Sequence, residues 1–246
     1  EKIEPLTNIL SKYSIYDAFL DGVILPPKIL WLKSQKEPET LHLVNILIKE
    51  IDKLPYKKII VWSGIIEECI NLAQAWKEYF KDYLISVDFS KQSECSNLKM
   101  NDNFKSFDEF YNKPNKAILF CAVKHREGSD IPNVDGCIFM DLVSQRSERV
   151  FIQSMGRVLR RDNENKKKYG LIIDLKAKST IDICNRVQHY LKLDNVFPWK
   201  YSVRKLSINK QSYFINQLDM IQGKITDNNF MATDKIYNRE DIIKLF

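Results

Sequence analysis

Hydrophobic and polar positions follow two alternating periods along residues 57–193. Short runs of β-branched and other apolar residues are separated by longer stretches in which apolar positions recur every three to four residues. The first pattern predicts strands and the second predicts helices. The predicted strands are apolar on both faces, which is typical of a parallel sheet covered by helices. The pattern therefore predicts an α/β lobe in which crossover helices connect parallel strands.

Five strands and four helices are predicted in this lobe. The strands cover residues 57–64 (KKIIVWSG), 83–89 (YLISVDF), 116–122 (KAILFCA), 136–142 (GCIFMDL) and 170–175 (GLIIDL). The helices cover residues 39–54, 65–80, 102–111 and 147–160. Trp62, at the end of the first strand, is expected to belong to the core, because aromatic side chains mostly serve packing there.

Three regions are expected along the chain. Residues 1–36 hold a helix broken at Asp21-Gly22 and then an extended segment held by Pro26-Pro27, as expected for a connector. Residues 37–193 form the α/β lobe. Residues 194–246 are basic and aromatic and have no clear periodicity, so they are assigned to an accessory segment.

Composition narrows the class of protein. The formal net charge of +6 is a weak bias toward a polyanionic partner, and a hydrophobic content of 44% allows a real core. The cysteines are scattered, without a CxxC pair or a nearby histidine, which indicates a reducing, intracellular protein without a zinc site. Cys121 and Cys137 lie in apolar runs and are expected to pack as small hydrophobic residues. The sequence shows neither a membrane span nor a secretory leader.

The helix predicted over residues 147–160 carries the strongest candidate chemistry. Gln153, Arg157 and Arg160 fall on one face of an α-helix, while its apolar positions face the sheet. Gly156 costs roughly 1 kcal/mol relative to alanine in such a helix, so something is expected to approach the backbone there. Guanidinium groups suit phosphate groups and the charge that develops during phosphoryl transfer. The alternative is a solvated basic face on an ordinary surface helix.

Three strand ends supply further candidates. The loop EGSDIP (127–132) predicts a rigid turn that presents a carboxylate beside a ligand, although an ordinary turn has the same composition. Ser63 and Gly64 end a strand where a helix begins, so they are candidates for phosphate binding; alternatively, Ser63 is a helix N-cap, and both roles are compatible. Ser90 ends the next strand and is a further candidate.

These ordered elements resemble the C-terminal RecA-like lobe of superfamily 2 helicases. QSMGRVLR (153–160) is similar to motif VI, QxxGRxxR, and EGSDIP is similar to motif V of the restriction-type branch, which includes type I and type III restriction translocases. KKIIVWSG is similar to motif IV. The segment YSIYDAFLDGVILPPKI (13–29) is similar to the connector that leaves the first motor lobe in that branch.

The resemblance implies a role for each candidate residue. Arg157 and Arg160 would be arginine fingers that reach the γ-phosphate of ATP, and Gln153 would couple nucleotide state to lobe closure. The residues implied at the nucleotide are Gly128, Asp130 and Gly156, with Asp130 near the ribose. The residues implied or considered for the nucleic-acid groove are Ser63, Gly64, Ser90, Lys124 and Arg126. Lys124 and Arg126, together with His125, are cations just before the EGSDIP loop, and the alternative is that these three only face solvent.

The sequence departs from the family pattern in two respects. Many relatives place a Thr or Ser hydroxyl about six residues before the motif V glycine, where this chain has Ala122, so that phosphate contact is in doubt. The chain also has no Gly-rich loop with Lys and Ser/Thr and no acidic pair for Mg²⁺. ATP with Mg²⁺ is therefore expected mainly on an N-terminal lobe of the same parent protein, and the chain is expected to be inactive alone.

The expected parent is an ATP-dependent helicase or translocase that acts on nucleic acid, with DNA favoured over RNA by the branch resemblance. The alternative is a binding module for nucleic acid or protein that kept this fold without the motor function. An upstream phosphate loop in the parent reading frame would discriminate between the two.

Overall fold

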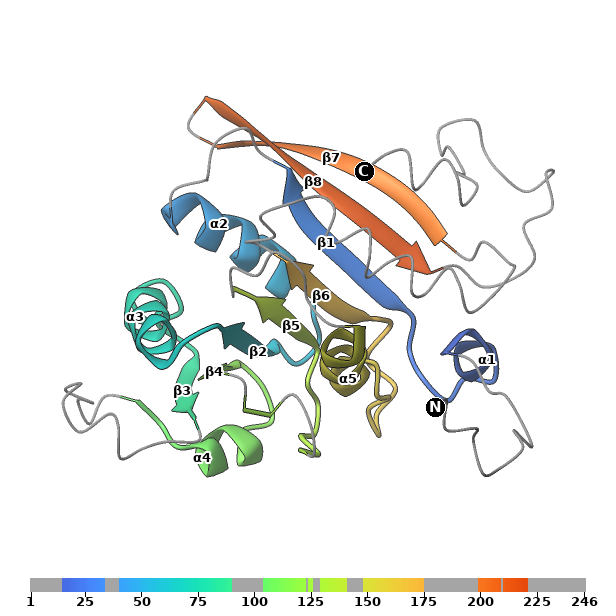
Figure 1. The fold of residues 1–246 in the computed structure, drawn as a ribbon, viewed down its shortest axis with the longest axis horizontal. Helices are drawn as coiled ribbons and strands as arrows, with labels where there is room; N and C mark the ends of the chain where they lie inside the picture. The colour runs from blue at the N-terminus through green and yellow to red at the C-terminus, as the bar shows by residue number, and fades with distance from the viewer. Residues whose placement is uncertain are drawn as a thin grey trace, which may run out of the picture.

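The computed structural model describes residues 15–33, 40–89, 104–122, 124–125, 129–140, 148–174, 199–208 and 210–220. They form an eight-stranded sheet with the strand order β3-β4-β2-β5-β6-β1-β8-β7 (Figure 1). The strands are β1 (Pro27–Lys33), β2 (Lys58–Ser63), β3 (Leu84–Asp88), β4 (Ala117–Ala122), β5 (Gly136–Phe139), β6 (Gly170–Asp174), β7 (Trp199–Ile208) and β8 (Gln211–Met220). β1 to β6 run parallel to one another, whereas β8 is antiparallel to β1 and β7 is antiparallel to β8.

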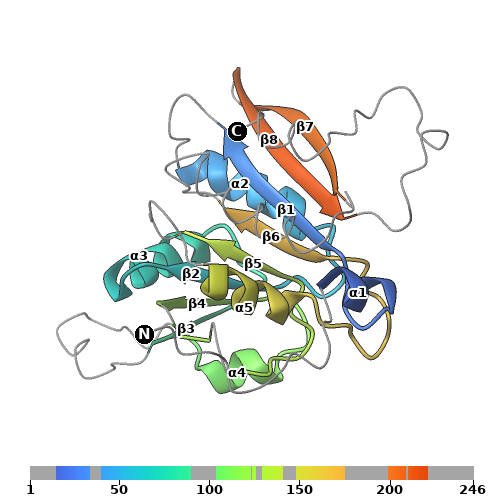
Figure 2. The ribbon, with the colours of Figure 1, turned by 45° about the vertical axis from the view of Figure 1, so that its right-hand side comes forward.

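Helices cover both faces of the sheet (Figures 1 and 2). The helices are α1 (Ile15–Leu20), α2 (Thr40–Ile51), α3 (Ile66–Lys77), α4 (Phe107–Asn112) and α5 (Glu148–Val158). The buried residues of α2 and α3 belong to one core cluster, and those of α4 and α5 belong to the other. The structure thus confirms a RecA-like, mostly parallel sheet with helices on both sides.

The alternation of side chains along the strands builds the two cores. In β2, Ile59 and Val61 pack on the side of α2 and α3, whereas Ile60 and Trp62 pack on the side of α4 and α5. Full burial of each such side chain contributes roughly 1.5–3 kcal/mol. Trp62 is fully buried and its ring stacks on Phe139 with centroids 5.4 Å apart, which confirms its expected place in the core. Cys121 and Cys137 are also buried in the core, as expected.

The predicted elements are confirmed with shifted ends, and one shift concerns the arginines. α5 ends at Val158, so Arg160 lies beyond the helix and forms an antiparallel bridge with Ile24. The Leu25 N–H donates to the Leu159 carbonyl at 2.8 Å, which draws the chain away from the helical path. The prediction that Arg160 shares a helical face with Gln153 and Arg157 is therefore wrong.

The structural role suggested for Ser63 is also wrong. The N-cap of α3 is Ile65, which makes no side-chain cap hydrogen bond. The Ser63 hydroxyl instead donates to the Ile65 carbonyl at 3.2 Å.

The hairpin of β7 and β8 is a feature that the sequence analysis did not predict. β8 pairs with β1, so the extended segment after Pro26 is a strand with neighbours on both sides, β6 and β8. Tyr213 and Ile215 of β8 join the core under α2 and α3, and Leu218 joins the opposite core. The hairpin is therefore packed into the same sheet as the lobe.

Candidate functional site

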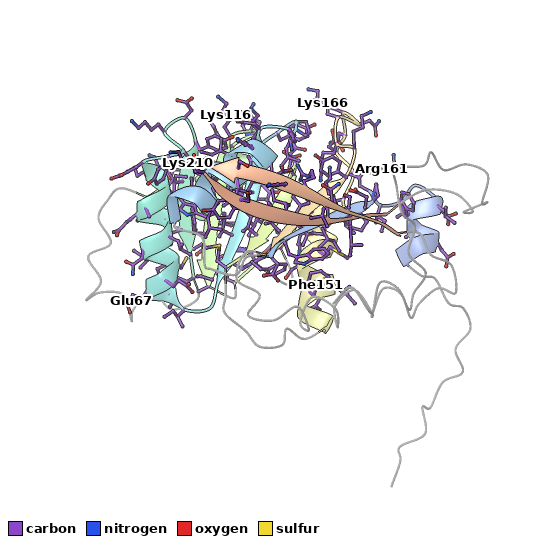
Figure 3. All side chains as sticks on the ribbon, turned by 90° about the horizontal axis from the view of Figure 1, so that it is seen from above. Glu67, Lys116, Phe151, Arg161, Lys166 and Lys210 are labelled. Carbon is purple, nitrogen blue, oxygen red and sulfur yellow. The ribbon has the colours of Figure 1, made fainter. Side chains whose placement is uncertain are left out.

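The candidate residues lie at two opposite edges of the parallel sheet. The strands β2, β3 and β4 all end at one edge, the carboxyl edge, and β2, β4 and β6 all begin at the other, the amino edge. Figure 3 shows the two edges: Lys116 and Lys166, which precede β4 and β6, lie on one side, and Glu67 and Phe151 lie on the other. The candidate residues therefore form two separate groups, one at each edge.

A cleft at the amino edge brings three of the predicted residues together. Its volume is about 180 Å³. The residues that line it are the loop 130–134 together with Arg157, Arg160, Arg161, Asp162, Asn163 and Lys167. Four cationic side chains thus face two carboxylates, so the cleft has a cationic excess that suits an anionic ligand.

The arginines of the cleft are held by the loop between β4 and β5. The Arg160 guanidinium pairs with the Asp130 carboxylate, and the Arg157 guanidinium donates to the Ser129 carbonyl. The side chains of Arg160 and Asp130 are 47% and 86% exposed, and an ion pair so open to water contributes only about 0–1 kcal/mol. A phosphate group can therefore compete for Arg160 at little cost.

The other two residues expected beside the nucleotide differ in their surroundings. Gly156 is exposed, and a Cβ added there would meet no heavy atom of the described residues within 4 Å, apart from the helix's own neighbouring backbone. Gln153 is half-buried and is not among the described residues that line the cleft. A group from outside this lobe could therefore approach the backbone of Gly156 closely.

Lys167 fixes the segment that carries Arg160. Its buried ammonium group donates to the carbonyls of Val134, Val158 and Arg160 at 2.7, 3.1 and 2.9 Å. Burial lowers the pKa of Lys167 to about 8, although Asp135 and Asp162 oppose this shift. A cation at the end of α5 also satisfies carbonyls that the helix leaves without partners. The burial of Lys167 could not be predicted from the sequence, because a lysine among polar neighbours gives no signal of burial.

Two buried carboxylates, Asp162 in the lining of the cleft and Asp135 next to Val134, belong to the same region. The Tyr56 hydroxyl donates to Asp162 at 2.6 Å, and the Asp162 carboxylate also accepts the N–H groups of Lys166 and Lys167. Burial opposes ionisation of Asp162, but these hydrogen bonds outweigh it and lower its pKa to about 2. For Asp135, burial dominates over Lys167 and over backbone hydrogen bonds, and it raises the pKa to about 6.

The carboxyl edge carries a second cluster, centred on Asp88 at the end of β3. Lys124 Nζ lies 2.8 Å from one carboxylate oxygen of Asp88, and His125 Nε2 lies 2.6 Å from the other. His125 Nδ1 lies 2.7 Å from the Ser129 hydroxyl oxygen. Burial would raise the pKa of Asp88, but the hydrogen bonds from His125 and Lys124 outweigh it and hold the pKa below its usual value.

Some of the residues predicted for nucleic-acid contact, namely Ser63, Gly64 and Lys124, are described and lie at this edge. Ser63 is buried and Gly64 is exposed. Lys124 is half-buried and paired with Asp88, so a phosphate would have to compete with that carboxylate. Three predicted residues lie outside the described residues, namely Ser90, Arg126 and Gly128.

Two further observations apply to the described part of the chain. It contains no group of three or more His, Cys, Asp or Glu side chains arranged to hold a metal ion. Within the same ranges, no helix has the length and apolarity that are needed to cross a membrane.

The fold and the cleft define a RecA-like lobe with arginines at one edge. Residues 42–162 match the helicase conserved C-terminal domain. This part of the chain belongs to that domain family, and it includes the β4–β5 loop, α5 and the arginines of the cleft. No curated protein matches the sequence.

Solved structures of helicases and related enzymes show a weak likeness. The C-terminal domain of Dbp5 from S. cerevisiae, bound to Gle1 and IP6, has a TM-score of 0.43 and 16% identity, over 66% of this chain and 82% of that chain. The type ISP restriction-modification enzyme LlaBIII bound to DNA has a TM-score of 0.47 and 15% identity, over 73% and 15% of the two chains. The helicase domain of Hef from Pyrococcus furiosus has a TM-score of 0.37 and 22% identity, over 62% and 28%.

These likenesses establish no shared function, because all three TM-scores lie below 0.5. The alignment spans only 15% of LlaBIII and 28% of the Hef chain. The activity of a longer protein that contains this lobe is therefore a matter of proposal.

Proposed function

We propose that this chain is the C-terminal motor lobe of a superfamily 2 ATP-dependent helicase or translocase. Its task is to supply Arg157 and Arg160 to ATP that is held mainly, with Mg²⁺, by an N-terminal lobe of the same parent protein. The observation that carries the proposal is the cationic cleft, which gathers Asp130, Arg157 and Arg160 from two separate segments.

The chemistry of the cleft fits a γ-phosphoryl group in transfer. Negative charge is spread over the phosphoryl oxygens in the transition state, and a planar, permanently charged guanidinium stabilises it. In the lobe described here, Arg160 is paired only with the exposed Asp130 carboxylate, which a phosphate can displace. Lys167 keeps the backbone of Arg160 in place while the side chain changes partner. Asp130 lines the same cleft and pairs with Arg160, so it would lie beside the same nucleotide, in keeping with its expected place near the ribose.

The carboxyl edge is the proposed nucleic-acid groove. Gly64 is exposed there, and Lys124 offers an ammonium group that can exchange the Asp88 carboxylate for a backbone phosphate. Such contacts bind phosphate without reading sequence, so the affinity should fall steeply as the salt concentration rises. DNA is favoured over RNA, because the EGSDIP loop resembles the restriction-type branch.

The proposal is tested by Arg160→Ala in the full-length protein. We expect nucleic-acid-stimulated ATP turnover to fall by roughly 10³-fold, since an arginine finger acts on transition-state charge. Nucleotide binding should change little, because most contacts to ATP lie on the other lobe. Lys168→Ala, which removes an exposed cation from the next turn of chain, is the matched control and should leave turnover intact. Unchanged turnover in Arg160→Ala would refute the assignment.

A second measurement concerns this chain alone. It should show no nucleic-acid-stimulated ATP hydrolysis, because its sequence holds no Gly-rich phosphate loop. Robust hydrolysis by a pure preparation would contradict the proposal that ATP is held mainly by another lobe.

A further inference from the structure

The loop between β4 and β5 connects the two edges of the sheet. It starts at the carboxyl edge, where Lys124 and His125 contact Asp88. It ends at the amino edge, where residues 130–134 line the arginine cleft. Ser129 lies between the two, and its carbonyl accepts a hydrogen bond from Arg157. One loop thus touches both the proposed nucleic-acid groove and the proposed nucleotide site.

His125 is buried and held by contacts on several sides. Its side chain is 6% exposed, and its two ring nitrogens lie 2.6 Å from Asp88 Oδ2 and 2.7 Å from Ser129 Oγ. The ring stacks on Phe107 of α4, with centroids 4.2 Å apart and planes 11° apart. Its backbone lies in the left-handed region with φ of 62°, which is uncommon for a residue other than glycine. Contacts from β3, α4 and the loop itself therefore hold this unusual conformation.

The ionised state of Asp88 decides which ring nitrogen of His125 donates and which accepts. The ionised Asp88 carboxylate can only accept, so His125 Nε2 donates to it. In the neutral imidazole, Nδ1 then accepts from the Ser129 hydroxyl. The side chain of Ser129 is thereby fixed to the end of β3, while its carbonyl holds Arg157. The same serine serves one edge through its hydroxyl and the other through its backbone.

We propose that His125 is a positioning residue that couples the state of the β3 end to Arg157 through Ser129. This inference rests on the proposed function. Asp88 divides its two oxygens between Lys124 and His125, so a nucleic-acid phosphate that takes Lys124 leaves His125 as the main partner of the carboxylate. The imidazole then shifts with the carboxylate, and Ser129 moves Arg157 relative to the cleft. Stimulation of ATP turnover by nucleic acid therefore depends on the hydrogen bond between His125 and Ser129.

Two substitutions of His125 separate positioning from simple packing. The amide nitrogen of asparagine stands close to the place of Nδ1 and can donate to the Ser129 hydroxyl oxygen, so His125→Asn keeps a bond to Ser129, with donor and acceptor exchanged, and loses the one to Asp88. The amide nitrogen of glutamine stands close to the place of Nε2, so His125→Gln keeps Asp88 and loses Ser129. Since coupling between sites is typically 5–150-fold, we expect His125→Gln to lower the nucleic-acid-stimulated kcat of the full-length protein by about tenfold, with little change in KM for ATP.

The same experiment includes the partner of His125. Ser129→Ala removes only the hydroxyl and keeps the carbonyl that binds Arg157, so it should lower stimulated kcat as His125→Gln does. The double variant should lose no more than either single variant, because both changes break one hydrogen bond. His125→Asn should retain most of the stimulation. If His125→Gln fails to fold, Ser129→Ala against wild type decides the question.

Three results would overturn the inference. The first is that Ser129→Ala keeps the wild-type stimulation of kcat by nucleic acid. The second is that His125→Asn loses as much stimulated kcat as His125→Gln does. The third is that the losses of the two single variants add up in the double variant. Arg157→Ala distinguishes this failure from failure of the proposed function. If that variant keeps full ATP turnover, the proposed function fails; if turnover is lost while Ser129→Ala behaves as wild type, only the coupling through His125 fails.

Discussion

The ammonium group of Lys167 lies 2.9 Å from the carbonyl oxygen of Arg160, inside the lobe and away from water. The same group donates to Val158 at the end of α5 and to Val134 in the loop before β5. One buried cation therefore joins the arginine segment to the loop on the other side of the cleft. Its burial has a measurable consequence for stability.

The stability of this chain should rise between pH 8 and pH 10 because of Lys167. Burial lowers its pKa from 10.5 in the unfolded chain to about 8 in the folded chain. Between these values the unfolded state binds more protons than the folded state, so the free energy of unfolding increases with pH. Lys167→Met should show a smaller increase, because burial also lowers the pKa of Lys58 to about 8 and that contribution remains. Urea unfolding of both proteins at pH 8 and 10 checks it, and parallel pH profiles would contradict it.

Tyr56 should stabilise the lobe through its hydroxyl group. Tyr56→Phe keeps the ring and removes the 2.6 Å hydrogen bond to Asp162, so we expect a loss of roughly 1.5–3 kcal/mol in the free energy of unfolding at pH 7. The folded pKa of Asp162 is about 2, below its ordinary value of 3.8, so its contribution is present above pH 4 and is lost as pH falls through 2. The effect of Tyr56→Phe should shrink accordingly at low pH. Tyr79→Phe, at an exposed tyrosine, is the control.

The hairpin of β7 and β8 should depend on an ion pair with α2. The Arg204 guanidinium of β7 lies 2.9 Å from the buried Glu50 carboxylate, which also pairs with Lys53 at 2.8 Å. Burial would raise the pKa of Glu50, but these two cations outweigh it and lower the pKa. Arg204→Met should destabilise the chain by about 1–2 kcal/mol, less than for a fully buried pair because Lys53 remains and Arg204 is partly exposed.

Lys205→Met is the matched control for Arg204→Met. Lys205 is the next residue on the same strand and is exposed. Thermal unfolding of the two variants beside wild type should show a lower midpoint only for Arg204→Met. Equal midpoints for both variants would show that the ion pair contributes nothing to holding the hairpin.

The sequence predicted the parallel core of this fold well because that core is built from local patterns. An apolar run such as that of β2, which includes Trp62, is buried on both faces when it lies in a sheet covered by helices. The hairpin was not predicted, although Tyr213 and Ile215 pack on one face of the sheet and Leu218 packs on the other. Its polar composition resembles a loop, and its pairing with β1 joins residues nearly two hundred positions apart.

The sequence predicted that some residues of the cleft belong together, and it predicted their geometry less well. The sequence grouped Asp130, Arg157 and Arg160, and the structure places all three at one cleft. Arg160 leaves the helix because backbone pairing with Ile24 competes with the helical path, and such a partner cannot be read from helical spacing. His125 and Lys167 were missed as supports for the same reason, since both act through long-range contacts.

The pair of Arg160 and Asp130 leads to the last prediction, which rests on the proposed function. If Asp130 binds the ribose of ATP, Asp130→Asn in the full-length protein should raise KM for ATP about tenfold, the value of one hydrogen bond of roughly 1.5 kcal/mol to a charged group. Because the pair is exposed, stability should change by no more than about 0.5 kcal/mol. Wild type should prefer ATP over 2′-deoxy-ATP, and the variant should lose that preference. Asp82→Asn, at an exposed aspartate outside the cleft, should behave as wild type in both assays. An unchanged preference in Asp130→Asn would mean that Asp130 serves only to hold Arg160 until phosphate arrives.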